Sequence, residues 1–323
     1  MKHKITKISI CLSLFCSLWM LSACDTKKMS VCTTSYPVAF LVERIGTPQI
    51  SACNISNNDT IQIAKPNEDF EKQLENAQTL IYISGMEPYF DVYADNIRSK
   101  NISYMDIASK LYLYPFGRYT NKPFADDDKP TQEMYYQGDV FDAINVYKKD
   151  PAFWMDPMTM LSAAEVVRDF LVYLYPEYTD DFTVNFDELE LELTRLDADY
   201  QLLEETAQNI AIASMSANFG YYQTAFGIQV YPVSISKYGA LPNEMQLAII
   251  KQKMMDENVR YIANEENLNE GMEQLYQELI EELGLIPVTL SNVSSLSDAQ
   301  RKKNKDYLTI MYENLTVLEG LGE

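Results

Sequence analysis

The clearest hydrophobic pattern in the chain is a set of apolar residues that recur every three or four positions. They are Phe182, Phe186, Leu189, Leu193, Leu196, Tyr200 and Leu203. This spacing lines one face of an α-helix, which turns once every 3.6 residues. A helix over residues 182–206 would be roughly 37 Å long at 1.5 Å per residue, longer than one lobe needs. We therefore predict a rigid helix that joins two parts of the molecule.

Before this helix, short apolar runs of strand type alternate with helical patterns. The expected strands cover residues 31–35, 49–55, 79–84 and 103–106, and the expected helices cover 39–44, 71–77, 91–99 and 158–174. Such alternation is typical of β-α units around a parallel sheet. Residues 115–150 have little apolar periodicity and form an expected loop, and Pro176 separates the last two helices.

After the long helix the alternation resumes. The expected strands are 210–215, 229–233, 261–263 and 286–290, with helices at 221–226, 244–257, 272–283 and 305–320. About 300 residues suit two cores better than one. We predict an α/β protein of two β-α lobes, each with a parallel sheet, joined by one long rigid helix with a ligand cleft between the lobes. The expected boundaries are 24–178 for the N-terminal lobe, 179–208 for the linking helix and 209–323 for the C-terminal lobe.

The N-terminus carries the pattern of an export signal. Lys2, Lys4 and Lys7 precede an uncharged apolar run over residues 8–23, which is short for a membrane-spanning helix. The run ends in Leu-Ser-Ala before Cys24, the pattern of a lipobox. We expect residues 1–23 to be a signal peptide and Cys24 to carry the lipid that anchors the chain at the outer face of the cytoplasmic membrane, on the cell surface or in the periplasm. The alternative is a buried helix that ends near a chance cysteine.

The charge balance argues against nucleic acid as a partner. The chain has 26 Lys and Arg residues against 47 Asp and Glu residues, a net charge of −21. Removal of residues 1–23 takes away three lysines and no acid, so the mature charge would be about −24. Such a surface repels nucleic acid and attracts cations, although acidity is also typical of exported proteins that need solubility.

Histidine and cysteine usage excludes several kinds of chemistry. The one histidine, His3, lies in the expected signal peptide. The mature chain therefore has no imidazole for acid–base catalysis, a catalytic triad or a His-ligated metal site, and we predict that it is not an enzyme. Apart from Cys24, the mature chain has Cys32 and Cys53, which in an oxidising compartment are either a disulfide or two buried thiols on neighbouring strands.

Short motifs occur in a specific order along the mature chain. They are Thr34-Ser35-Tyr36-Pro37, Gly85-Met86-Glu87-Pro88-Tyr89, Trp154-Met155-Asp156-Pro157, Asn218-Phe219-Gly220-Tyr221, Asn264-Glu265 and the run from Tyr307 to Leu315. In order and spacing these motifs resemble the zinc- and manganese-type (cluster A-I) solute-binding lipoproteins of ABC importers. The resemblance extends from about Val31 to Leu318 and implies two lobes joined by a rigid helix.

The resemblance also implies where a metal would bind, and the chain departs from the family at each position. Glu68, Ala152 and Ser216 stand where the family has histidines, and Lys305 stands at the position of an acidic ligand, unless a shift of one residue places Asp306 there. Glu265 is a further candidate acid of the cleft. Zinc prefers nitrogen and sulfur ligands, and the side chains that remain offer oxygen donors and an ammonium group.

We therefore expect an extracytoplasmic solute-binding lipoprotein of a metal-type ABC importer in which zinc binding is doubtful. No cofactor is assigned, and a divalent cation remains open, but not in a His-ligated site. The expected partners are the permease, with direct contact, the ATPase, the lipid bilayer and a small solute or cation. The alternative is a surface adhesion or interaction protein that kept the scaffold and lost the metal site.

Two further expectations concern charged residues. The acidic run Asp126 to Asp128 gathers cations weakly or is simply a solvated loop. Because Glu68 and Lys305 would come from opposite lobes, we also expect an ion pair between them that replaces a metal ion.

Overall fold

The computed structural model describes residues 28–57, 59–116, 136–203 and 210–322. Its first lobe contains a parallel sheet in the order β2-β1-β3-β4, formed by β1 (Met29–Thr33), β2 (Ile50–Asn54), β3 (Thr79–Tyr82) and β4 (Ser103–Asp106). The helices of this lobe are α2 (Tyr36–Gly46), α3 (Phe70–Asn76), α4 (Pro88–Val92) and α5 (Ala94–Arg98). This order places the ends of β1 and β3 next to each other.

The second lobe repeats the arrangement. Its parallel sheet has the order β6-β5-β7-β8, formed by β5 (Ala211–Ser214), β6 (Gln229–Pro232), β7 (Tyr261–Ala263) and β8 (Ile286–Val288). The helices are α10 (Gly220–Phe226), α11 (Glu244–Asp256), α12 (Glu270–Leu283), α13 (Asp298–Lys302) and α14 (Tyr307–Gly322). Here the ends of β5 and β7 are adjacent.

Between the sheets the chain passes through short helical turns into two long helices. The elements are η1 (Ala108–Lys110), α6 (Asp139–Asp142), η2 (Phe153–Met155), α7 (Pro157–Leu174), η3 (Pro176–Tyr178) and α8 (Thr179–Gln201). The start of α7 is fixed by Asp156, whose carboxylate accepts from the main-chain N–H groups of Met158 and Thr159, with Pro157 in the first turn.

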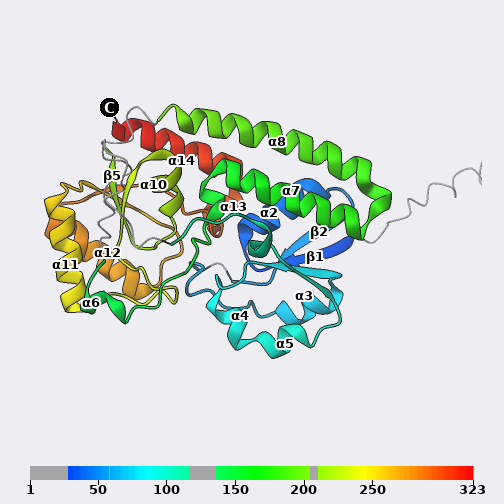
Figure 1. Cartoon of the computed structure of the whole chain (residues 1–323), viewed down its shortest axis with the longest axis horizontal. Helices are drawn as coiled ribbons and strands as arrows, with labels where there is room; N and C mark the ends of the chain where they lie inside the picture. Colours follow the sequence, from blue (N-terminus) through cyan, green and yellow to red (C-terminus); the bar gives the residue numbers. More distant parts are fainter. Residues whose placement is uncertain (1–27, 58, 117–135, 204–209, 323) are drawn as a thin grey trace, which may run out of the picture.

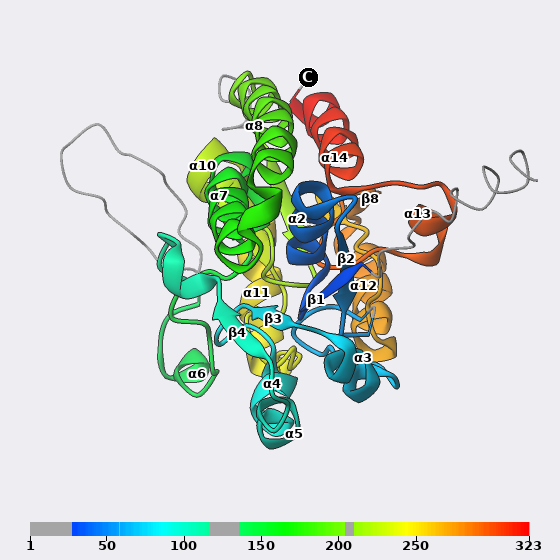
Figure 2. The ribbon, with the colours of Figure 1, turned by 90° about the vertical axis from the view of Figure 1, so that its right-hand side faces the viewer.

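Helix α8 connects the lobes along one side of the molecule (Figure 1). It packs beside α7 and α2 near the first lobe and beside α14 of the second lobe. Figure 2 shows α8 and α14 at one end of the molecule and α4 and α5 at the other. The buried face of α8 consists of the apolar residues from Phe182 to Tyr200 that predicted the helix. These residues are part of a hydrophobic core that extends into both lobes.

The predicted fold class, two parallel α/β lobes and a long helix, is confirmed. The structure changes several element bounds. Helix α8 begins at Thr179, directly after η3, and the expected helix over 91–99 is divided at Tyr93 into α4 and α5. Among the described helices, none combines the length and the apolar character needed to cross a bilayer.

Candidate functional site

The two lobes place a hydroxyl and a buried glutamate at the carboxyl ends of their central strands. In the first lobe, Thr34 follows β1 and Glu87 follows β3. In the second lobe, Ser216 follows β5 and Glu265 follows β7. In open α/β sheets, ligands bind outside the carboxyl ends of the strands where the strand order reverses. The candidate site is therefore the region next to the carboxyl ends of the central strands of the two sheets.

In the second lobe the carboxylate of Glu265 accepts four hydrogen bonds. Its Oε1 accepts from the main-chain N–H of Met215 at 2.7 Å and of Ser216 at 2.9 Å. Its Oε2 accepts from Asn292 Nδ2 at 2.7 Å and from the Ser216 hydroxyl. Burial raises the pKa of Glu265, and these donors lower it, because they stabilise the charged form. Each oxygen already has two donors, so this carboxylate offers no open position to a ligand unless a donor leaves.

In the first lobe the carboxyl group of Glu87 has a less complete set of partners. Its Oε1 accepts from the Thr34 hydroxyl, whereas its Oε2 is buried without a hydrogen-bond partner. Burial raises the pKa of Glu87 to about 8, with the Thr34 hydrogen bond opposing the shift. The group is therefore mostly neutral at pH 7.

The lobes meet through polar side chains next to these strand ends. Gln62, in the segment between β2 and α3, exchanges hydrogen bonds with Asn218, which lies between β5 and α10. Both amides are buried, with Gln62 4% and Asn218 1% exposed. Two residues before Gln62, the Thr60 N–H and hydroxyl donate to the carbonyl oxygen of Asn267 at 3.3 and 3.0 Å.

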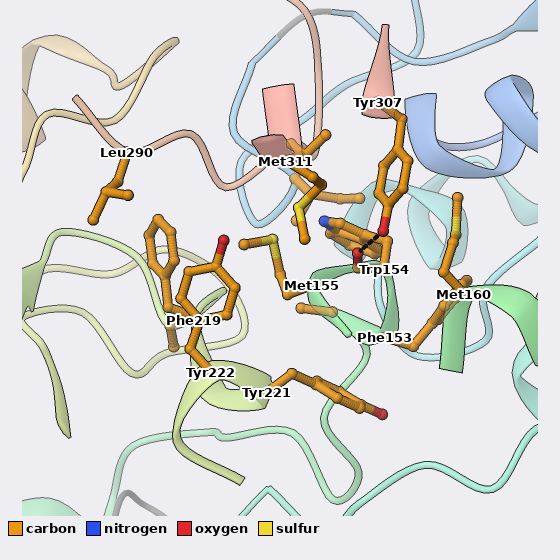
Figure 3. Packing of buried hydrophobic residues seen from close by; sticks show 14 of the residues in the cluster. Phe153, Trp154, Met155, Met160, Phe219, Tyr221, Tyr222, Leu290, Tyr307 and Met311 are labelled. Carbon is orange, nitrogen blue, oxygen red and sulfur yellow. Dashed lines mark hydrogen bonds between the residues drawn. The ribbon is translucent and has the colours of Figure 1, made fainter. Parts of the chain in front are cut away.

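Apolar and aromatic side chains surround a second contact between the two halves (Figure 3). Trp154 of η2 donates its indole N–H to the carbonyl oxygen of Asn292 at 2.8 Å, and the Tyr307 hydroxyl donates to the carbonyl oxygen of Trp154 at 2.6 Å. Met155, also of η2, lies beside Tyr222 and Phe219 of the second lobe in this view. These contacts hold η2 against the second lobe.

Two of the sequence-predicted site residues lie in the buried polar region, and a third is buried without a functional group. Ser216 and Glu265 are joined by hydrogen bonds, as described above. Ala152 is fully buried, and its N–H donates to Asp150 Oδ1 at 3.0 Å. Asp150 is buried too, and burial raises its pKa to about 7.

The other predicted positions lie elsewhere. Glu68 is exposed, because it sits in a turn before α3. Lys305, which lies two residues before α14, pairs with Glu313 of that helix at 2.6 Å. The expected ion pair between Glu68 and Lys305 is therefore wrong: Lys305 pairs with Glu313, and Glu68 is exposed. Asp306 is the cap of α14, since its Oδ1 accepts from the N–H and the hydroxyl of Thr309.

The two cysteines of the first lobe form a disulfide. Cys32 of β1 and Cys53 of β2 are directly opposite each other in the parallel ladder, and their Cα atoms are 4.4 Å apart. Cys24 and the acidic run Asp126 to Asp128 lie outside the described residues.

The residues at the candidate site do not fit a zinc ion. Within the described part of the chain, no three His, Cys, Asp or Glu side chains are grouped so that they could hold a metal. Zinc sites in proteins use Cys, His and carboxylate ligands in a tetrahedral arrangement. The cross-lobe contact instead presents two neutral amides.

Gln62 and Asn218 are the site residues that the sequence interpretation missed. Gln62 stands alone as a polar residue in the run Ile61-Gln62-Ile63-Ala64. A lone amide among apolar residues indicates a buried polar group that needs a partner, and this signal could have identified it.

Comparisons with known proteins agree with this architecture. The family model described as "Zinc-uptake complex component A periplasmic" matches residues 31–320. The zinc-binding protein AdcA of Streptococcus pyogenes serotype M1 is 24% identical over 98% of this chain, and the zinc-binding lipoprotein AdcA of Streptococcus pneumoniae is 22% identical over 97%. The chain spans only 61% and 60% of the length of these two relatives.

Solved structures show the same fold. The AdcAII protein of S. pneumoniae superimposes with a TM-score of 0.72 at 18% identity, covering 92% of this chain and 99% of that one. The laminin-binding protein Lmb of Streptococcus agalactiae gives a TM-score of 0.71 at 20% identity, covering 91% and 100%. TroA of Treponema pallidum gives 0.69 at 15% identity, covering 91% and 99%.

Proposed function

The chain belongs to the family of the zinc-uptake complex component A, and on that premise we propose that it is the extracytoplasmic solute-binding component of a metal-type ABC importer. The relatives that share most of its length are named as zinc-binding proteins and lipoproteins. Under this proposal the chain delivers a solute to a permease, and a separate ATPase drives the transport.

The observation that carries the proposal is the buried polar cluster that links the two lobes through Gln62 and Asn218. Ser216 and Glu265 in the second lobe and Gln62 in the first lobe are buried polar side chains, and Asn218 connects the two sides. Buried polar groups are costly unless they are paired, so such a cluster at the carboxyl ends of parallel strands supports a ligand site.

The chemistry of these residues favours a cargo held by hydrogen bonds over a zinc ion. The donors and acceptors are amides, hydroxyls and main-chain groups around one carboxylate. Mg²⁺ and Ca²⁺ also accept oxygen ligands, but such an ion would have to displace the donors that already saturate Glu265. We propose that the cargo is a small polar solute that replaces part of this hydrogen-bond network.

The test is to purify the chain from residue 24 onward without chelators and to analyse what it retains. Native mass spectrometry would give the mass of any bound solute, and elemental analysis would give the metal content. We expect far less than one zinc per chain and a small organic compound that is released on denaturation. One zinc per chain, together with loss of zinc after Glu265→Ala, would overturn the proposed cargo.

We further propose that Cys24 anchors the chain to the membrane through a lipid. The support is the basic and apolar leader that ends in the Leu-Ser-Ala-Cys sequence. Cys24→Ala should leave the precursor unprocessed or release the protein from the membrane fraction, as measured by labelling with a radioactive fatty acid and by fractionation. The matched control is Cys32→Ala, which should keep the label. Unchanged labelling of the Cys24 variant would contradict the anchor.

A further inference from the structure

The contact between Gln62 and Asn218 differs in kind from the other bonds that cross between the lobes. The Thr60 bonds to Asn267 end on a main-chain carbonyl, and so does the Trp154 bond to Asn292. Between Gln62 and Asn218, by contrast, each amide donates to the other: Gln62 Nε2 donates to Asn218 Oδ1, and Asn218 Nδ2 donates to Gln62 Oε1 at 3.4 Å. The two side chains are thus each other's partners across the lobes, and Gln62 also contacts the Tyr147 hydroxyl.

Because both amides are buried, the loss of either partner would be costly. A buried amide without a partner costs roughly 1–3 kcal/mol, because it has lost its water and gained nothing. With the pair formed, each amide has a donor and an acceptor engaged across the lobes, and the contact needs no charge. A metal ion at this point would replace the hydrogen bonds of the pair by two amide oxygens, which are weak ligands without carboxylate support.

The backbone next to the pair is also fitted to a closed arrangement. Gly239 of the second lobe has φ +64°, and a Cβ at this position would lie 2.5 Å from Ile63 Cγ2 and 3.5 Å from Gln62 Cβ. Any side chain at residue 239 would therefore push against the segment that carries Gln62. The close approach depends on the glycine.

We propose that the Gln62–Asn218 pair is a cross-lobe latch that closes the cleft without a metal ion and excludes divalent cations from it. A solute enters only when it replaces the hydrogen bonds between the two amides, by offering each amide a donor and an acceptor of its own. The latch thereby selects neutral, hydrogen-bonding cargo. This proposal rests on the proposed function in one respect: the lobes must separate to admit a solute.

Hydrogen–deuterium exchange of the peptide over residues 60–64 reports the state of the latch directly. The Thr60 N–H in this peptide donates across the lobes to Asn267, so it exchanges when the lobes separate. We expect Gln62→Ala and Asn218→Ala each to speed this exchange roughly three- to tenfold. The double variant should be no faster than the faster single variant, because either change removes the same contact.

Two more variants separate the latch from a loss of packing. Gln62→Met keeps the length of the side chain and should behave as Gln62→Ala does. The exchanged pair, Gln62→Asn with Asn218→Gln, keeps two amides of the same combined length and should restore slow exchange. The matched control is Asn314→Ala, which removes a buried amide bonded to Ser291 and Tyr222 inside the second lobe and should leave the 60–64 peptide unchanged.

Adding metal ions to the exchange experiment tests whether cations are excluded. Zinc chloride or manganese chloride at micromolar concentration should leave exchange of the 60–64 peptide in the parent protein unchanged. Slower exchange with either ion would overturn the proposal, as would single variants that exchange at the parental rate. These outcomes are independent of whether the purified chain retains an organic solute, which tests the proposed function instead.

Discussion

The two lobes have the same strand order but hold the glutamate after their third strand in different ways. Glu265 in the second lobe has four donors, two of them main-chain N–H groups, which oppose the rise in its pKa that burial causes. Glu87 in the first lobe has the Thr34 hydroxyl on one oxygen and no partner on the other. The second lobe is thus prepared for a carboxylate, and the first lobe for a neutral carboxylic acid.

This difference indicates a division of roles. Glu265 holds Ser216 and Asn292 in fixed positions, so the second lobe presents a rigid polar surface next to Asn218. Glu87 lies beneath the segment of Thr34 and contributes a group that changes charge near neutral pH. Burial raises the pKa of Glu265 as well, but the rise for Glu87, to about 8, is large, so we expect the larger response of stability to pH from the first lobe.

The largest expected effect is a loss of stability as the pH rises. Burial raises the folded-state pKa of Glu87 to about 8 and of Asp150 to about 7, from 4.5 and 3.8. Between the ordinary and the raised pKa values, the folded chain binds more protons than the unfolded chain. The contribution of these two groups to the free energy of unfolding is therefore largest below pH 4 to 5. This contribution, on the order of a few kcal/mol, is lost as the pH rises through 7 and 8.

Urea denaturation at pH 5.5, 7 and 8.5 measures this slope. Glu87→Gln combined with Asp150→Asn should flatten it, because the amides do not titrate. The single Asp156→Asn change is a poor substitute, since Asp156 also caps α7. A free energy of unfolding that rises from pH 5.5 to 8.5 in the parent would contradict the assignment.

The next effect in size concerns the disulfide, which the first lobe has and the second lacks. Cys32 and Cys53 close a loop with a sequence separation of 21 residues, whereas β5 and β6 contain no cysteine. A loop of this length predicts that Cys32→Ser with Cys53→Ser lowers the free energy of unfolding by about 3 kcal/mol. Urea denaturation with and without reductant checks this: reductant should destabilise the parent and leave the double variant unchanged.

A smaller effect distinguishes the two glutamates directly. In Glu265→Gln an NH₂ group replaces one oxygen and meets the donors around it, at an expected cost of roughly 1–3 kcal/mol. In Glu87→Gln a neutral amide replaces a carboxyl group that is mostly neutral at pH 6 and meets no donor at its second oxygen, so we expect a smaller loss than for Glu265→Gln. Thermal unfolding of both variants at pH 6 provides the comparison, and equal losses would show that the two sites are not different in kind.

The sequence was sufficient to predict the fold because the signal is repeated along the chain. The residues from Phe182 to Tyr200 that defined the helical face are the buried face of α8, and the β-α alternation appears twice. Ser216 and Glu265 were candidates through the motifs that resemble the family, and the structure places both just after strands.

Other site residues could not be placed, for local reasons. Glu68 and Gln62 share a segment between β2 and α3 that has no periodic pattern, and the apolar neighbours of Gln62 indicate burial but not the partner that it needs. The structure buries Gln62, because Asn218 is there to pair with it, and leaves Glu68 exposed. That choice depends on a contact 156 residues away along the chain, which a single sequence does not reveal.

The smallest effect is expected for Lys305, and it decides whether the start of α14 belongs to the site of the second lobe. The Lys305–Glu313 pair is partly exposed, with 22% and 49% of the two side chains accessible. Exposed ion pairs contribute roughly 0–1 kcal/mol, so Lys305→Ala should change thermal stability very little. The adjacent variant Asp306→Ala serves as the reference, because it removes the cap of α14 and should cost about 1 kcal/mol.

If Lys305 instead held the cleft closed in place of a metal ion, Lys305→Ala would produce measurable zinc binding in a calorimetric titration and faster exchange of the 60–64 peptide. We expect neither result, since the latch side chains are the amides of Gln62 and Asn218 and the lysine ammonium pairs with Glu313 of α14.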